Sequence, residues 1–399
     1  MKRSKIRYDI GKLFKENWKW INQHSGMNTH QKRMLHAVSV CRTSVLGYHL
    51  DSCSSCDFVQ ISYNSCRNRH CPKCQSIQRE QWIMQREEEL LPVPYFHVVF
   101  TMPDVLNTLC LYQPKMLYDL LFKCAWQTIK TFAADPKHLG AKTGMTAILH
   151  TWGQTMTLHP HLHCIVPGGG LTSDGKWKTA RSKGKFLFPA KAMSLVFRAK
   201  FVAELRKQAA AKNIKVESSI YKKLFAKQWV VYAKRPFASP KTVVEYLGRY
   251  THKIAISNSR ITNIDATTVE FRYKDYRQQS STNNCLHVKT MQLDIKEFVR
   301  RFAMHVLPLR FQRIRHFGIL ASRNKAATLE AARASLGVQH PPCIQPIDWK
   351  TIARKRLGFD PEVCPTCQAK TFVRVYSSVS KRQRIRAPPI QPSTVCFTP

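Results

Sequence analysis

Two closely spaced pairs of cysteines constrain the fold of this chain more than any other feature. Two residues separate Cys53 from Cys56 and Cys71 from Cys74, and fourteen residues lie between the pairs. Zinc ribbons bind one tetrahedral ion through two such pairs of thiolates. The residues within the pairs are polar, which argues against four cysteines buried in a core. The basic start of the chain has no apolar run after it, which argues against export and therefore against a disulfide framework. The spacing therefore predicts a zinc-ribbon-like module in a reducing cytoplasm.

Other side chains are further candidates for a zinc site. Cys66 and His70 lie between the pairs, where they would replace a cysteine ligand, join a second site or only pack around the first. His49 is a weaker candidate. Far along the chain, Cys364 and Cys367 form half of the same motif. This pair is either part of a second site or accidental, and the sequence leaves both alternatives open.

The charge of the chain indicates the class of its partner. The chain has 64 Lys and Arg but 24 Asp and Glu, a formal net charge of +40. A protein this basic usually binds a polyanion, and nucleic acid is the commonest one. Arg67 and Arg69 are candidates for contacts with DNA phosphates. No stretch approaches the roughly 18 apolar residues of a membrane span, so the sequence predicts a cytoplasmic, nucleoid-associated protein without membrane contact.

Composition divides the chain into three parts, residues 1–92, 93–323 and 324–399. The first part is the basic, cysteine-rich zinc-binding domain, and it ends with a helix expected over 75–91 that two prolines terminate. The last part is a C-terminal extension that contains the distant cysteine pair. Its basic, proline-rich end from residue 380 on is expected to be disordered.

The middle part alternates between strand and helix patterns. Short β-rich runs predict strands over 96–101, 145–152, 161–166, 228–233, 254–257 and 267–273. Helical periodicity predicts helices over 114–132, 190–211, 239–250 and 294–306, and another over 325–336 in the extension. This mixture predicts an α+β fold in which a sheet has helices on one face.

The sequence LHPHLHCIVP at 158–167 concentrates histidines around a predicted strand. Because side chains alternate along a strand, His161 and His163 point to one face while Leu162 points to the other. These two imidazoles, about 7 Å apart at their Cβ atoms, could bind one divalent ion. Most such pairs are ordinary strand histidines, so the motif alone is weak evidence for a metal site.

A pair of tyrosines strengthens this hypothesis. Tyr246 and Tyr250 are four residues apart in the helix predicted over 239–250, so they are neighbours on one face. A tyrosine hydroxyl is a weak nucleophile because its pKa is near 10, but a divalent ion on the histidines would neutralise charge that develops on a phosphate. Together these residues predict attack on a phosphodiester that leaves a 5′-phosphotyrosine and a free 3′-hydroxyl. Two tyrosines would hold two strands at once.

Four segments resemble one known family in the family's own order. They are 65–75 (SCRNRHCPKCQ), 151–170 (TWGQTMTLHPHLHCIVPGGG), 246–253 (YLGRYTHK) and 298–318, which contains HVLP and RIRHFG. The family is the insertion-sequence-ninety-one family of two-tyrosine HUH transposases, which move bacterial insertion sequences by a rolling-circle route. The resemblance implies an N-terminal zinc-binding domain followed by an HUH endonuclease domain, whose antiparallel sheet with helices is ferredoxin-like or palm-like.

The resemblance also implies roles for particular residues. The HUH histidines correspond to His161 and His163, and the nucleophiles correspond to Tyr246 and Tyr250. The expected cofactors are a structural Zn ion and a catalytic Mg or Mn ion. The expected partner is DNA, mainly the single-stranded ends of the mobile element.

Other details of the expected active site are open. HUH enzymes usually have a third metal ligand, and Gln154 or His159 could supply it here. Arg249 and Lys253 are expected to bind phosphate because they are near the tyrosines in the sequence. The order in which the tyrosines attack, the DNA sequences recognised and the oligomeric state do not follow from the sequence.

Two other functions compete with DNA transposition. A replication initiator or relaxase would use the same HUH chemistry on a plasmid substrate, and the motifs near the site do not distinguish it. A non-catalytic zinc-ribbon DNA-binding protein would use the histidines and tyrosines only for packing. That alternative predicts that replacing both tyrosines with Phe leaves every activity unchanged.

Overall fold

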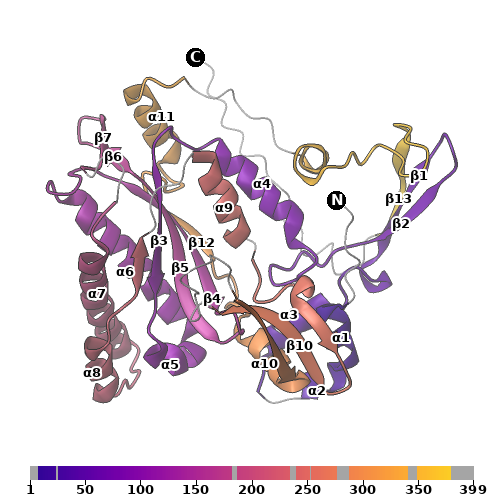
Figure 1. Cartoon of the computed structure of the whole chain (residues 1–399), viewed down its shortest axis with the longest axis horizontal. Coiled ribbons are helices and arrows are strands. Elements are labelled where there is room, and N and C mark those ends of the chain that lie inside the picture. Colours follow the sequence, from indigo (N-terminus) through magenta and orange to yellow (C-terminus); the bar gives the residue numbers. More distant parts are fainter. Residues whose placement is uncertain are drawn as a thin grey trace. The chain divides into compact units, whose positions relative to one another are not determined.

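The computed structural model describes residues 8–23, 26–181, 187–233, 240–251, 253–275, 287–339 and 348–378. These residues form two compact units (Figure 1). Unit 1 contains the residues up to Trp82, Ser257–Ser259 and the described residues from 348 on. Unit 2 contains Ile83–Ile256 and the described residues from Arg260 to 339.

A five-stranded antiparallel sheet is the framework of unit 2. Its strand order is β12-β4-β5-β3-β8. The strands are β3 (Tyr95–Thr101), β4 (Gly144–Trp152), β5 (Leu158–Pro167), β8 (Val231–Ala233) and β12 (Ile314–Gly318). Strands β4 and β5 are adjacent both in the chain and in the sheet, so a short turn at 153–157 connects them.

The long helices α6 (Pro114–Ala134) and α7 (Ala190–Ala211) cover one face of this sheet (Figure 1). Alternate strand residues point into the same apolar core as these helices, for example Phe96 and Phe100 of β3 and Leu162 of β5. Pro114 is at the N-terminus of α6, where its fixed φ favours helix formation. Proline has no N–H, but an N–H at this position would form no hydrogen bond within the helix. The remaining residues of β3 and β5 therefore point to the opposite face.

Helix α9 (Pro240–Thr251) lies on that opposite face, because its Tyr246 contacts His97 of β3 edge-on. It also packs closely against α4 (Gln75–Glu87): a Cβ atom on Gly248 would lie 2.1 Å from Cδ1 of Ile83. Only glycine fits between the two helices without displacing that side chain. The expectation that helices cover one face of the sheet is thus incomplete.

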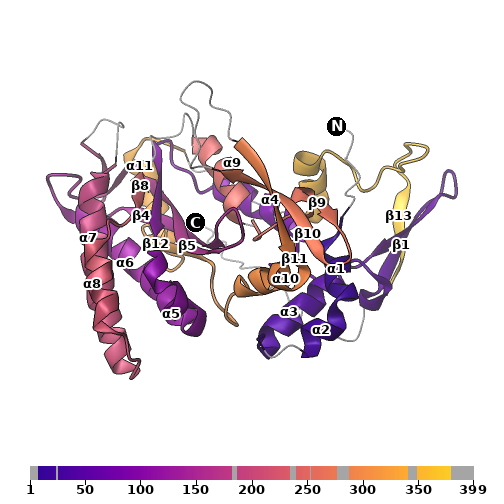
Figure 2. The same ribbon diagram turned by 60° about the horizontal axis from the view of Figure 1, so that its bottom comes forward.

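A second antiparallel sheet in unit 2 has the order β11-β10-β9. Its strands are β9 (Ile261–Ile264), β10 (Thr268–Asp275) and β11 (His287–Asp294), and α10 (Ile295–Met304) packs beside it (Figure 2). The Asp294 carboxylate caps α10 by accepting a hydrogen bond from the N–H of Lys296, 2.7 Å away. Phe298 of α10 packs against Phe271 of β10. The apolar stripe predicted for this helix is the buried face that makes this contact.

Shorter elements complete unit 2. They are η2 (Asp104–Leu106), α5 (Asn107–Tyr112), β6 (Gly169–Leu171), β7 (Trp177–Thr179), α8 (Ser218–Ala226) and α11 (Lys325–Ser335). A short 3-10 turn, η3 (Asn258–Arg260), spans the boundary between the units in the sequence.

Unit 1 combines short helices with a three-stranded antiparallel sheet of order β13-β1-β2. Its elements are α1 (Ile10–Glu16), α2 (Trp18–Gln23), α3 (Thr29–Ser39), η1 (Ser44–Leu46), β1 (Tyr48–Cys53), β2 (Val59–Tyr63), α12 (Trp349–Ile352), the π-helical turn η4 (Ala353–Leu357) and β13 (Phe372–Ser377). A capping box formed by Asn28 and Gln31 starts α3. Strand β13, far along the chain, pairs with β1 (Figure 2).

The structure confirms a mixed α+β fold with antiparallel sheets. Residues 254–257, predicted as a strand, form no strand in the structure. The extension predicted from residue 324 is divided, because α11 belongs to unit 2 while 348–378 belong to unit 1. The end from residue 380 on lies outside the described residues. Within the described ranges, no helix combines the length and apolar character needed to cross a membrane.

Candidate metal centres and active site

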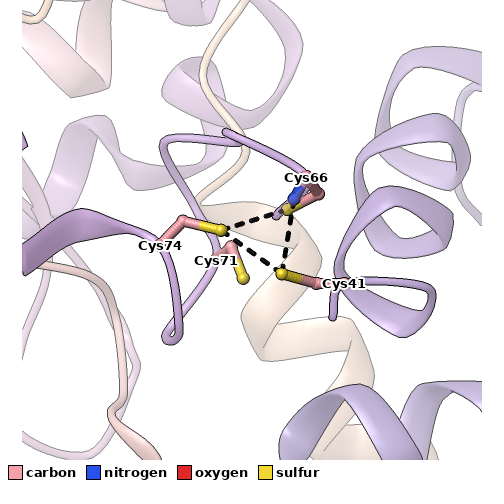
Figure 3. Close-up of side chains that lie close together, drawn as sticks. All are labelled: Cys41, Cys66, Cys71 and Cys74. Carbon is pink, nitrogen blue, oxygen red and sulfur yellow. Dashed lines mark hydrogen bonds between the residues drawn. The ribbon is translucent and has the colours of Figure 1, made fainter. Parts of the chain in front are cut away.

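The first cluster of cysteines lies in unit 1 between α3 and α4. Its thiols come from Cys41, just after α3, from Cys66 in the loop after β2, and from Cys71 and Cys74, just before α4 (Figure 3). All four Sγ atoms lie within 4.8 Å of one another, and that of Cys74 is 3.3 Å from Cys41 and 3.6 Å from Cys66. Neighbouring thiolates on a tetrahedral zinc ion are about 3.8 Å apart, given bonds of about 2.3 Å. The arrangement fits such an ion.

Backbone amides and nearby side chains support this cluster. The N–H of Cys66 points at the sulfur of Cys41 and the N–H of Lys73 at that of Cys71, both at 3.4 Å. A hydrogen bond from Cys41 lowers the pKa of Cys74, and one from Cys66 lowers that of Cys41, whereas contacts with the same neighbours raise the pKa of Cys66 and Cys71. Thiolate is the form of cysteine that binds metal, so a bound cation is needed to keep all four sulfurs in that form.

A second cluster of cysteines joins the two ends of unit 1. Cys53 and Cys56 lie at the β1–β2 turn, and Cys364 and Cys367 lie in the turn before β13. The Sγ atoms of Cys53 and Cys367 are 3.6 Å apart, and those of Cys56 and Cys364 are 3.7 Å apart. A hydrogen bond from the Thr371 hydroxyl, 3.2 Å from the sulfur, lowers the pKa of Cys53 to about 6.

A cluster of histidines occupies the face of the large sheet opposite α6 and α7. Nitrogen atoms of His150, His161 and His163 all lie within 4.8 Å of one another. His150 of β4 is directly opposite His161 of β5 in the antiparallel register, and His163 is two residues further along the same face. His150 and His163 are buried, and His161 is half-buried.

Hydrogen bonds at the outer nitrogens orient these imidazoles. Nδ1 of His161 lies 2.7 Å from the carbonyl oxygen of His159, so this nitrogen carries the proton and donates it. The lone pair of His161 Nε2 is then available, and it lies 3.2 Å from Nε2 of His163. On its other side, Nδ1 of His163 lies 2.9 Å from Nε2 of His97, and the two rings stack. Such outer partners fix the orientation of metal-binding histidines.

Burial favours the neutral form of two imidazoles of this cluster, those of His161 and His163. Desolvation lowers the pKa of His161 to about 4, and the nearby charge of Lys253 acts in the same direction. Desolvation, together with the charges of His161 and Lys253, also lowers the pKa of His163 far below its ordinary value. Neutral imidazole is the form that binds a cation. His161 and His163 are thus in the form that can hold a divalent ion at neutral pH, and a nitrogen of His150 lies within reach of the same ion.

Tyr246 of α9 approaches this cluster through His97. Its ring meets the ring of His97 edge-on, with 5.2 Å between centroids, and His97 in turn stacks on His163. The close packing of Gly248 on Ile83 fixes α9 next to α4 and so helps to position this tyrosine.

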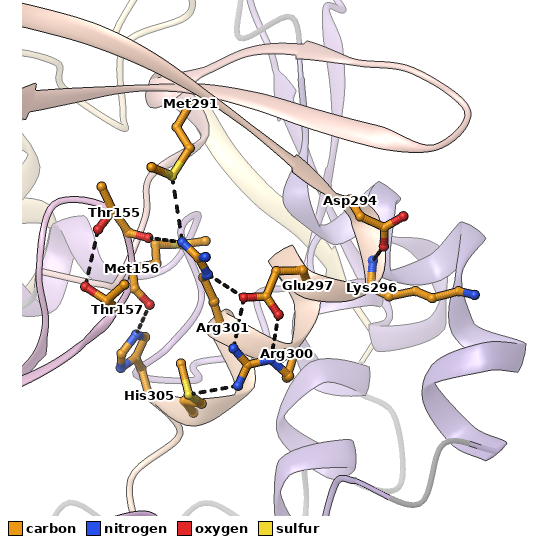
Figure 4. Close-up of polar contacts among 11 residues, drawn as sticks. Thr155, Met156, Thr157, Met291, Asp294, Lys296, Glu297, Arg300, Arg301 and His305 are labelled. Carbon is orange, nitrogen blue, oxygen red and sulfur yellow. Dashed lines mark hydrogen bonds and ion pairs between the residues drawn. The ribbon is translucent and has the colours of Figure 1, made fainter. Parts of the chain in front are cut away.

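Helix α10 braces the turn that joins β4 to β5 (Figure 4). The guanidinium of Arg301 donates to the carbonyl oxygen of Thr155 at 3.0 Å and pairs with Glu297 at 2.7 Å. His305 donates from Nε2 to the carbonyl oxygen of Met156 at 3.0 Å, and its Nδ1 lies 3.1 Å from the Thr151 hydroxyl. Because His150 precedes this turn and His161 follows it, these contacts hold the two strand ends that carry the cluster.

Comparison with known proteins establishes the family. Residues 13–102 match a family described as a transposase zinc-binding domain, and residues 144–327 match one described as a putative transposase. The chain is 40% identical over 368 residues to a putative transposase, y4qJ, of Sinorhizobium fredii. This match covers 88% of the chain and 91% of that relative. The chain belongs to the IS91 family of transposases.

A second relative agrees with this assignment. The IS91-family transposase is 30% identical over 369 residues to the transposase for insertion sequence element IS801 of Pseudomonas savastanoi pv. phaseolicola. That match covers 90% of this chain and 87% of the relative. No solved structure matches the transposase. The resemblance predicted from the sequence motifs is therefore confirmed, and DNA is the partner that a transposase acts on.

The structure corrects how the cysteines of the transposase group together. Cys53 and Cys56 were predicted to share one ion with Cys71 and Cys74, but the two pairs lie in different clusters. Proximity in the sequence misled the prediction, because Cys41 and Cys66 complete the first cluster and the distant 364–367 pair completes the second.

The remaining zinc candidates, His70 and His49, belong to neither cluster. His70 is buried, and its backbone N–H donates to Asn68. His49 lies in β1 and pairs with Asp51 at 3.6 Å.

The structure adds a histidine to this cluster that the sequence analysis did not name. Gln154 and His159 were the candidates for a third metal ligand, and His150 is the side chain that lies with His161 and His163. The Gln154 side chain points instead toward the backbone N–H of Lys274, 3.5 Å from its Oε1. His159 is exposed and uses its carbonyl oxygen to orient His161.

Some predicted residues of the transposase lie partly outside the described structure. The backbone of Tyr250 and Arg249 is part of α9, but their side chains are outside the described residues. Lys253 is described, and its charge lowers the pKa of both His161 and His163. Arg313 donates to its carbonyl oxygen at 2.5 Å.

Sequence reasoning missed three residues that carried weak signals. His97 and His150 each occupy a predicted strand and alternate with core residues, so both point to the face opposite the core. Their meeting with His161 and His163 depends on strand order and register, which a single sequence does not reveal. Cys41 is an isolated cysteine with no partner at a two-residue gap.

Proposed function

We propose that unit 2 cleaves and rejoins single-stranded DNA through Tyr246 and Tyr250, with a Mg or Mn ion held by His150, His161 and His163. The observation that carries this proposal is the convergence of three imidazoles with Tyr246 on one face of the sheet. The fold class, the family and the charge of +40 agree with DNA as the substrate.

The donor set of the histidine cluster suits a divalent ion. The separation of 3.2 Å between Nε2 of His161 and Nε2 of His163 is close to the roughly 3 Å between adjacent ligands with metal bonds of about 2.1 Å. Both nitrogens are on the inner side of the cluster, and partners occupy their outer nitrogens. When bound, such an ion would polarise the phosphate and neutralise its developing charge.

The tyrosine supplies the nucleophile in this proposal. Its hydroxyl proton leaves to solvent, and the phenolic oxygen forms a bond to phosphorus while the bond from phosphorus to the 3′ oxygen breaks. The 3′ oxygen takes up a proton and becomes a free hydroxyl. The 5′-phosphotyrosine retains the energy of the phosphodiester, so a 3′-hydroxyl can reverse the step and join strands. A second tyrosine, Tyr250, would allow two strands to be held together.

A groove in unit 1 is suited to hold nucleic acid. The groove has a volume of about 3260 Å³, and Arg33, Arg42, Arg67 and Arg69 are among the residues that line it. Exposed aromatic side chains also line it, namely those of Tyr63, Trp349 and Phe359. Cationic grooves with exposed aromatic rings bind single strands through phosphate contacts and base stacking. We assign phosphate binding there to Arg67 and Arg69, and phosphate binding near the tyrosines to Arg249 and Lys253.

Variants of the histidine cluster test this function. His150→Ala and His161→Ala should abolish cleavage of single-stranded oligonucleotides that carry the element's ends, while DNA affinity stays within a few-fold of the wild type. His159→Ala is the matched control, because its ring lies beside that of His161, with 5.2 Å between centroids, but supplies no nitrogen to the cluster, and it should retain cleavage. If His150→Ala cleaves normally, His150 is not part of the metal site. Loss of both cleavage and binding would indicate a folding role instead.

A further inference from the structure

The second cluster of cysteines is assembled from segments that are distant in the sequence. Its two pairs, Cys53 with Cys56 and Cys364 with Cys367, are separated by about 300 residues, yet their sulfurs approach within 3.6 and 3.7 Å. The family match for the zinc-binding domain covers residues 13–102 and therefore includes only the first pair. Nothing in that match accounts for the second pair.

The two turns that carry these cysteines have the same backbone geometry. In each turn the residue after the second cysteine has a positive φ, 54° for Asp57 and 61° for Gln368. In each, the N–H of that residue donates to the carbonyl oxygen of the first cysteine at 3.0 Å. A positive φ is unfavourable for a residue with a side chain, and it persists where the surroundings require it. The same conformation follows Cys41 and Cys66 of the first cluster, at Arg42 and Arg67.

Amide and hydroxyl donors point at the sulfurs, as they do around metal-bound thiolates. The N–H of Thr366 is 3.4 Å from the sulfur of Cys364, and the Thr371 hydroxyl is 3.2 Å from that of Cys53. Such hydrogen bonds stabilise negative charge on sulfur and orient the ligand. Sulfur separations of 3.6 and 3.7 Å are close to the roughly 3.8 Å between thiolates on one tetrahedral zinc ion.

The packing around the second cluster of cysteines indicates a structural role for a metal ion there. Its apolar core consists of Cys53, Cys364 and Phe372, with Phe58 packed against them. Strand β13 nevertheless pairs with β1 along its length, from Cys53 opposite Phe372 to His49 opposite Ser377. A core this small does not hold a strand from the far end of the chain, and small modules of this kind commonly need a bound metal.

We propose that Cys53, Cys56, Cys364 and Cys367 bind a second structural zinc ion, which fixes the C-terminal segment 348–378 onto the N-terminal hairpin. The chain thus carries two zinc ions in unit 1, one in each cluster of cysteines. This inference does not depend on the DNA chemistry proposed for unit 2. It makes the C-terminal segment part of the zinc-binding domain.

Zinc stoichiometry tests the proposal on the full-length chain. Native mass spectrometry and elemental analysis of freshly purified wild-type protein should find two zinc ions per chain. The double variant Cys364→Ser/Cys367→Ser should retain one, and Cys41→Ser/Cys66→Ser should retain the other. Cys110→Ala is the control, because this buried cysteine belongs to neither cluster, and it should retain two. One zinc ion in the wild type, unchanged in Cys364→Ser/Cys367→Ser, would overturn the proposal.

Limited proteolysis supplies a readout of the structural role. Trypsin should cut the Cys364→Ser/Cys367→Ser variant after Lys355, Arg356 or Lys370 at least ten-fold faster than the wild type, while sites in unit 2 remain as resistant as before. Equal rates in the two proteins would refute the fixation of the segment. If alkylation of the zinc-bound wild type without reductant shows disulfides among these four cysteines, the second zinc site is also excluded.

Discussion

A single added methyl group on α9 tests the packing that positions Tyr246. In Gly248→Ala, the new Cβ would lie 2.1 Å from Cδ1 and 2.4 Å from Cγ1 of Ile83. These distances are roughly 1.5 Å shorter than ordinary contacts between carbon atoms. Because Cγ1 is not the flexible end of the side chain and Ile83 is buried, α4 or α9 must move.

The expected cost combines two opposing terms. Overpacking of this kind typically destabilises by about 1–3 kcal/mol. Alanine is favoured over glycine within a helix by about 1 kcal/mol. Since two atoms of Ile83 clash, we expect the overpacking term to dominate and Gly248→Ala to destabilise α9 by about 1–2 kcal/mol.

A double-mutant cycle with Ile83→Ala isolates this contact. In that background the nearest remaining atom of residue 83 is its Cβ, 3.9 Å from the added methyl, which is an ordinary contact. Gly248→Ala should then stabilise α9 by about 1 kcal/mol, although Ile83→Ala alone costs about 2–5 kcal/mol. The expected coupling between the two substitutions is about 2–3 kcal/mol.

Hydrogen exchange of the α9 amides measures these free energies locally, and DNA cleavage gives a second readout. Cleavage should be slower in Gly248→Ala than in the wild type. It should be faster in the double variant than in Ile83→Ala alone. Additive effects, or stabilisation by Gly248→Ala in the wild-type background, would refute the packing of α9 on α4.

Three further outcomes follow from the described side chains. Burial lowers the pKa of His305 to about 4 from an ordinary 6.5, so the unfolded chain takes up a proton first as pH falls from about 6.5 to 4. This group alone should reduce the free energy of unfolding by up to about 3 kcal/mol over that window. The free energy of unfolding in urea should therefore depend less on pH in His305→Gln than in the wild type. Equal pH dependence in the two proteins would contradict the lowered pKa of His305. Affinity for single-stranded DNA should fall with salt at a log–log slope of about −0.7 per phosphate contacted, and Arg67→Ala should reduce the slope by about one such step. A flat salt dependence in a filter-binding assay would exclude the electrostatic binding. Chelation of zinc should remove hydrogen-exchange protection from residues 40–80 while the five-stranded sheet keeps its protection. Simultaneous loss of protection in residues 40–80 and in the sheet would mean that the metal does not act locally.

Local sequence patterns predicted the local structure well. The helix expected over 190–211 has those bounds in the structure, and the stripe expected over 294–306 is the buried face of α10. These elements depend on periodicity within one segment, which the sequence contains in full. The run at 254–257 is too short for its β-rich composition to be decisive, and it forms no strand.

Contacts between distant segments could not be predicted in the same way. The His161 and His163 pair follows from alternation along one strand, whereas His150 joins them only because β4 pairs with β5 in a particular register. The cysteine motifs likewise predicted metal binding but not which pairs combine. Chain closure over about 300 residues costs only about 2–3 kcal/mol more in entropy than closure over about fifteen, so a few tertiary contacts can outweigh sequence proximity.

The most direct test of the proposed chemistry is the covalent intermediate itself. Wild-type protein, incubated with Mn²⁺ and labelled single-stranded oligonucleotides that carry the element's ends, is expected to form a protein–DNA adduct on a denaturing gel. The adduct should disappear when Tyr246→Phe and Tyr250→Phe are combined. Intact DNA with every divalent metal while tight binding persists, or an adduct that survives in the double variant, would contradict the account.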